Sequence, residues 1–173
     1  PIALARSMGL HESQSLSFEM QLASHPGFAG LMEPLVRRHL GDQAAFAAEN
    51  LHRLMTRVAP GYIRVDADEV TYPAHVILRH AIEQRLIAGT LLPKDLPTAW
   101  NAEVKAMLGV DVPNDTLGCM QDVHWPGGSF GYFPAYTFGA VGAAQLMQAL
   151  RREHPTVSDD IRKGNFKPIR DWL

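Results

Sequence analysis

The sequence contains only one cysteine, Cys119, so an internal disulfide framework is excluded. A chain with a single thiol fits a reducing compartment, and we predict a cytoplasmic protein. No apolar run approaches the roughly 18 to 20 residues that a bilayer-spanning helix needs, so no membrane is expected as a partner. The formal net charge is only −2. This weak charge gives no electrostatic reason to expect nucleic acid as a partner.

Helical periodicity dominates the rest of the sequence. The hydrophobic share of 46% over 173 residues is enough for a buried core, and we treat residues 1–173 as a single helical unit. Asp42 is expected to cap the third helix, and Ile77, Leu78 and Ile82 should lie on the buried side of the fourth. The spacing of apolar residues therefore predicts an all-α fold, with helices over 9–24, 28–40, 42–58, 66–88, 93–108 and 135–153.

Residues 109–134 break this pattern. Three prolines and five glycines alternate here with large rings, including Trp125, Tyr132 and Phe133. Such a composition predicts an irregular, aromatic loop region rather than a helix. Loops that a rigid scaffold holds in place often carry chemistry, so this region is a candidate site.

The stretch "HESQ", 11–14, contains half of a zinc-peptidase motif. His11 and Glu12 match the start of His-Glu-x-x-His, but the fifth position is Ser15. Consecutive helical residues point about 100° apart, so His11 and Glu12 cannot easily hold one ion. On these residues alone, an exposed helical carboxylate is the simpler interpretation of Glu12.

Two further segments contain candidate binding groups. In "IRVDAD", 63–68, Arg64 suits a substrate carboxylate through paired hydrogen bonds, although a surface salt bridge fits equally well. In the loop, His124 or a tyrosine hydroxyl could donate to a developing oxyanion. A polar core loop with aromatic plugs is an equally good explanation. The loop's polar candidates are Gln121, Asp122, His124, Tyr132 and Tyr136.

The remaining histidines and the cysteine give weaker signals. His75 and His80 are five residues apart, which is poor chelating geometry on a helix, and both are expected to be packed or at the surface. Cys119 lies close in sequence to His124, so a cysteine-dependent enzyme is conceivable. No oxyanion-hole pattern accompanies this pair.

The segments "HESQ", "IRVDAD" and "GCMQDVHW", 118–125, resemble three signature motifs of the M32 family of zinc metallocarboxypeptidases, in the same order and with similar spacing. The resemblance extends over nearly the whole chain. It implies an all-α homodimer that holds one catalytic divalent ion, usually zinc, in a long cleft and removes single residues from peptides with a free C-terminus.

The same resemblance assigns roles to individual residues. Glu12 would be the third metal ligand, and Arg64 would bind the terminal carboxylate of the substrate. His11 and Gln14 would lie beside the metal and orient ligand or substrate, and His124 would steady the oxyanion with Tyr136 or, as second choice, Tyr132. We also place Gln121 and Asp122 among the substrate-binding residues.

One departure from the family is important. The chain has no His-Glu-x-x-His motif, so two histidine ligands and the general-base glutamate of the family are absent. We therefore expect the C-terminal part of such an enzyme, inactive alone and completed by a missing N-terminal portion. The alternative is a helical interaction module derived from the family that has no catalytic activity.

Overall fold

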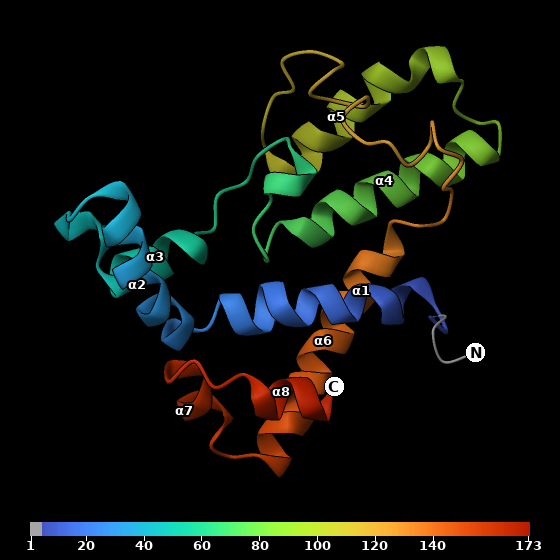
Figure 1. The fold of residues 1–173 in the computed structure, drawn as a ribbon. Coiled ribbons are helices and arrows are strands. Elements are labelled where there is room, and N and C mark those ends of the chain that lie inside the picture. Colours follow the sequence, from blue (N-terminus) through green and yellow to red (C-terminus); the bar gives the residue numbers. More distant parts are fainter. Residues whose placement is uncertain (1–4) are drawn as a thin grey trace. The chain divides into compact units, whose positions relative to one another are not determined.

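The computed structural model describes residues 5–173, and every regular element in that range is helical (Figure 1). The all-α prediction is confirmed. The α-helices are α1 (Met8–Leu16), α2 (Pro26–Leu40), α3 (Ala48–Met55), α4 (Tyr72–Ile87), α5 (Leu96–Leu108), α6 (Pro134–Glu153), α7 (Val157–Arg162) and α8 (Lys167–Trp172). A π-helix, Ser17–Ala23, continues α1, and short 3-10 turns occur at Ala44–Phe46, Arg64–Asp66 and Pro93–Asp95.

The chain divides into two compact units. The first contains the N-terminal residues up to Arg57 together with Phe138–Leu173, and the second is Val58–Thr137. The boundary falls inside α6, after its first turn. That residues 1–173 fold as a single unit stays a prediction.

The core of the first unit is formed where α6, α7 and α8 meet the π-helix. Met147 and Leu150 of α6 are at most 3% exposed and pack with Val157 and Ile161 of α7. Each such side chain contributes about 1.5–3 kcal/mol when it leaves water. Leu22 of the π-helix and Ile169 of α8 complete this cluster. The packing fixes the C-terminal helices around α6.

The core of the second unit lies between α4 and α5. Leu78 and Ile82 are fully buried against Trp100 and Val104. Gly109 ends α5 in the left-handed conformation that glycine adopts without strain. The region from Gly109 to Phe133 then contains only turns and bends, which confirms the predicted irregular loop.

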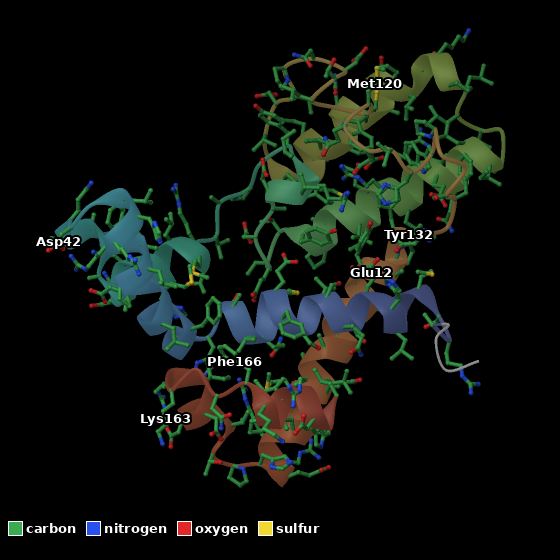
Figure 2. All side chains as sticks on the ribbon, viewed as in Figure 1. Glu12, Asp42, Met120, Tyr132, Lys163 and Phe166 are labelled. Carbon is green, nitrogen blue, oxygen red and sulfur yellow. The ribbon has the colours of Figure 1, made fainter. Side chains whose placement is uncertain are left out.

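Two details differ from the sequence expectations. Asp42 does not cap a helix, because its carboxylate pairs with Arg37, and α3 begins only at Ala48 (Figure 2). The Ala48 N–H instead donates to Glu33 Oε2 at 2.8 Å. Ile77 is 57% exposed, because polar side chains share the buried side of α4 with Leu78 and Ile82.

Candidate functional site

Glu12 lies in the middle of α1, within the first unit (Figure 2). A Cβ at Gly139 of α6 would lie 2.6 Å from Glu12 Cβ and 3.0 Å from its carbonyl carbon. Real Cβ atoms do not approach other atoms so closely, so only glycine lets α6 lie against the backbone at this point. Ser13, the next residue, is buried, whereas His11 and Gln14 are exposed. The contact between α1 and α6 therefore fixes the backbone that carries Glu12.

The residues of this chain do not by themselves fit a catalytic metal centre. A catalytic zinc ion usually takes three protein ligands. Among residues 5–173, no group of three histidine, cysteine, aspartate or glutamate side chains is placed to hold an ion. Whether Glu12 is a ligand stays a prediction, and this chain would contribute one carboxylate of a larger set.

The second unit gathers the other predicted site residues around one buried carboxylate. Asp122 Oδ1 accepts from Arg64 Nε at 2.8 Å and lies 2.7 Å from Arg64 Nη2. The second oxygen, Oδ2, accepts from Arg79 Nε at 2.6 Å. The side chains of these three residues are at most 10% exposed, so solvent screens the ion pairs weakly. Asp122 thus binds two arginines at once.

Gln121 adds a second shared acceptor. Its Oε1 accepts from the backbone N–H of Arg64 at 2.8 Å and from Arg79 Nη2 at 2.9 Å. Its amide nitrogen donates to the carbonyl of Tyr62 at 3.0 Å. Gln121 therefore ties the 3-10 turn that carries Arg64 to the loop and to α4. Direct contact of Gln121 or Asp122 with substrate stays a prediction.

The charges of this cluster stabilise one another against the cost of burial. Burial raises the pKa of Asp122, but the charge of Arg79 and the hydrogen bonds from both arginines outweigh it, so the net shift is downward. Burial lowers the pKa of Arg79 to about 10, which still leaves it charged at neutral pH. For Arg64, the hydrogen bond and charge of Asp122 outweigh burial and raise the pKa. All three groups are therefore ionised at pH 7.

His124 and Tyr136 form a polar pair beside Arg64. His124 Nε2 lies 2.9 Å from the Tyr136 hydroxyl, and Arg64 Cζ lies 5.0 Å from the centre of the Tyr136 ring. Tyr132 packs against both members of the pair, with ring centres 5.5 Å from His124 and 5.3 Å from Tyr136. Arg64 Nη1 donates to the Tyr72 hydroxyl at 2.6 Å. The predicted carboxylate-binding residue, Arg64, and the predicted oxyanion donors, His124 and Tyr136, are thus neighbours in one unit.

Sequence reasoning missed three residues of this cluster: Tyr72, Arg79 and Glu83. Glu83 is buried and accepts from Trp125 Nε1 at 2.8 Å and from the Gly131 N–H, so it anchors the loop at two points. A usable signal exists, because His75, Arg79 and Glu83 recur every four residues along a helix whose other buried positions are apolar.

The alternative based on Cys119 receives no support from its surroundings. Burial, together with the charge of Asp115, raises the pKa of this thiol, which disfavours the thiolate that a nucleophile needs.

His75 is fully buried in the second unit, as expected for a packed histidine. None of the helices in the described part of the chain is both long and apolar enough to cross a membrane.

Comparison with known sequences agrees with the motif resemblance. The family model for the Carboxypeptidase Taq (M32) metallopeptidases matches residues 1–173. Thermostable carboxypeptidase 1 of Pyrococcus furiosus is 36% identical over the whole chain, and that of Thermus thermophilus is 40% identical over 168 residues. The matched region is only 35% and 33% of those two proteins. The chain thus spans about a third of the length of the curated relatives it matches.

Solved structures agree as well. A Trypanosoma cruzi metallocarboxypeptidase 1 superposes with a TM-score of 0.88 at 48% identity, over 98% of this chain and 36% of that protein. A Pyrococcus furiosus carboxypeptidase superposes with a TM-score of 0.92 at 36% identity, over 100% of this chain and 35% of that protein. With a family model that covers every residue and a shared fold, the chain belongs to the Carboxypeptidase Taq (M32) metallopeptidase family.

Proposed function

We propose that this chain is the C-terminal part of an M32 metallocarboxypeptidase, which hydrolyses the last peptide bond of a peptide with a free C-terminus. The observation that carries the proposal is the buried ion-pair network of the second unit. Two arginines there share one aspartate, beside a histidine–tyrosine pair. Such a network can accept one more negative charge, and the C-terminus of a peptide supplies one.

Arg64 is the proposed anchor for that terminal carboxylate. A guanidinium has five N–H donors, and Arg64 directs one to Tyr72 and two to Asp122. Two N–H donors, one on each terminal nitrogen, therefore remain for a ligand. Charge-assisted hydrogen bonds of this kind select a carboxylate over an amide, which is the choice that defines an exopeptidase. Asp122 and Tyr72 hold the guanidinium in place, and Gln121 holds the backbone N–H of Arg64.

His124 and Tyr136 are the proposed oxyanion donors. When the imidazole proton lies on Nε2, His124 donates a hydrogen bond to the Tyr136 hydroxyl. The hydroxyl can then donate its own hydrogen to the oxygen that becomes negative in the tetrahedral intermediate. Tyr132, in ring contact with both, is the second choice for this role. Both tyrosines belong to the same unit as Arg64.

Glu12 is the proposed metal ligand of this chain, with zinc as the ion. When bound, the metal supplies a Lewis acid and lowers the pKa of a coordinated water. The other ligands and the general base would come from the N-terminal portion of the enzyme, since the relatives are about three times as long as this chain. His11 and Gln14, exposed on the same helix, would orient ligand or substrate.

Two features of the whole enzyme belong to the same proposal. The family resemblance supports a homodimer, and the single cysteine supports a cytoplasmic location. The alternative, an interaction module without catalysis, predicts that the full-length protein has no peptidase activity. Both interpretations leave the isolated chain inactive, so they must be distinguished in the complete protein.

The test is the Arg64→Ala variant of a full-length protein that contains this segment. Loss of two charge-assisted hydrogen bonds should lower kcat/KM for a peptide with a free C-terminus by about 100-fold or more. Hydrolysis of the matching C-terminal amide should change little, because that substrate cannot use the anchor. Equal losses for both substrates, or none for either, would reject the role of Arg64. Absence of activity in the full-length wild type would favour the interaction module.

A further inference from the structure

We propose that Arg79, which no motif singles out, is the positioning residue of the carboxylate site: it orients Arg64 through Asp122 and Gln121 and leaves the network one positive charge in excess. This inference rests on the proposed function, because it takes Arg64 to be the anchor for the terminal carboxylate. Arg79 itself is fully buried and does not contact the ligand.

The geometry shows how Arg79 reaches Arg64. The two arginines share both of their principal acceptors. Asp122 gives Oδ1 to Arg64 and Oδ2 to Arg79, and Gln121 Oε1 accepts from both residues. Asp122 meets Arg64 only through Oδ1, at Nε and Nη2, and because Arg79 holds Oδ2, that second oxygen cannot turn to the remaining N–H groups of the Arg64 guanidinium. Two N–H donors of Arg64 therefore stay available for a ligand.

Arg79 is a rigid support for this purpose. Its Nη1 donates to the His75 carbonyl at 3.1 Å, and its Cζ lies 4.6 Å from the centre of the Trp100 ring. Trp100 packs edge-on against Trp125, whose indole N–H is held by Glu83. Arg79 is thus fixed from α4, α5 and the loop simultaneously.

The charge balance of the network also depends on Arg79. Within the ion-paired network, Arg64 and Arg79 carry two positive charges and Asp122 carries one negative charge. The buried carboxylate of α4, Glu83, accepts hydrogen bonds from Trp125 and Gly131 instead. Without Arg79, Arg64 and Asp122 would be a neutral pair with little attraction for a further anion. With Arg79, a monocarboxylate brings the network to neutrality.

The experiment uses the 173-residue chain and two probes, N-acetyl-L-phenylalanine and its amide. Binding is followed by NMR, through the chemical shifts of the Arg64 Nε–H and of the backbone amides. Arg79→Gln removes the charge, Arg79→Lys keeps it, and Arg79→Gln combined with Asp122→Asn restores one positive charge in excess. Arg64→Gln tests the anchor itself. Circular dichroism compares the fold of all variants.

We expect the wild type to prefer the carboxylate and Arg79→Gln to bind it about tenfold more weakly, with amide binding unchanged. Arg79→Lys should recover most of the preference, because it keeps the charge. The double variant should recover only part of it, because the charge returns without the carboxylate that orients Arg64. A merely structural role of Arg79 would produce neither recovery. Without ligand, the Arg64 Nε–H resonance should shift in Arg79→Lys, because the fork that Arg79 extends to Gln121 and Asp122 is lost.

Different failures contradict different claims. If Arg79→Gln retains the wild-type preference while Arg64→Gln loses it, the inference about Arg79 is wrong and the anchor stands. If Arg64→Gln retains the preference, or the wild type has none, the anchor is wrong and the inference is overturned with it. Should Arg79→Gln not fold, an unshifted Arg64 resonance in Arg79→Lys would still refute the positioning role.

Discussion

A buried histidine next to a buried arginine limits the pH range over which the second unit is stable. His75 Nδ1 lies 3.2 Å from Arg79 Nη1, so the imidazole must be neutral to accept that hydrogen bond. Burial, followed by the charge of Arg79, lowers the pKa of His75 to about 4. The unfolded chain, with an ordinary histidine pKa near 6.5, binds the proton first.

Stability should therefore fall as the pH drops from about 6.5 to about 4. The folded state binds fewer protons than the unfolded state in this window, and the contribution of His75 is about 1–2 kcal/mol after allowance for solvent screening. His75→Gln keeps an acceptor for Arg79 but cannot titrate. Denaturant unfolding of both proteins at several pH values measures the effect. An equally steep decline in His75→Gln would show that other groups cause it.

At the scale of elements, the contact between α1 and α6 depends on one missing side chain. Gly139 lies against the backbone of Glu12 and Ser13, and Gly142 has Ser13 Cβ only 3.3 Å from its ideal Cβ position. These two glycines thus let α1 and α6 cross (Figure 1) at the residue Glu12, which Figure 2 labels.

Gly139→Ala should lower the free energy of unfolding by about 1–3 kcal/mol, because the added methyl group meets backbone atoms that cannot move aside easily. Gly30→Ala is the matched control. Gly30 is an exposed residue of α2 with no atom within 4 Å of its ideal Cβ, so alanine there should stabilise the helix by about 0.5–1 kcal/mol. Thermal or denaturant unfolding measures both. A neutral Gly139→Ala would mean that α1 and α6 do not pack in this way.

Sequence periodicity predicts some elements far better than others. The helices over 28–40, 93–108 and 135–153 are well predicted, since glycine or proline residues lie at or near their ends. The start of α3 is poorly predicted, because the carboxylate that caps it belongs to Glu33 of α2, fifteen residues earlier in the chain. A capping partner on another helix leaves no local signal.

The candidate site shows the same limit. The motifs place Arg64, Gln121 and Asp122 in one family pattern, and the structure brings these three together. Arg79 and Glu83 escape notice because their partners lie more than forty residues away along the chain. Their regular spacing on α4 could have marked them as a polar stripe, but not as partners of the loop.

At the scale of the whole molecule, several large apolar side chains have no cover. Leu54 and Phe138, both in the first unit, are 68% and 70% exposed. Where such side chains form a contiguous patch, they mark a surface that other polypeptide covers. The greater length of the relatives offers such a cover, as does association between copies of the chain. Either kind of cover agrees with the proposal that this chain is one part of a larger enzyme.

Metal binding tests that proposal most directly. Zinc affinity and stoichiometry should be measured by equilibrium dialysis for the 173-residue chain and for a full-length protein that contains it, with and without Glu12→Gln. We predict no tight stoichiometric zinc on the chain alone, one zinc ion on the full-length protein, and a large loss of affinity in Glu12→Gln. One tightly bound ion on the isolated chain, or unchanged affinity in the full-length Glu12→Gln variant, would contradict the account.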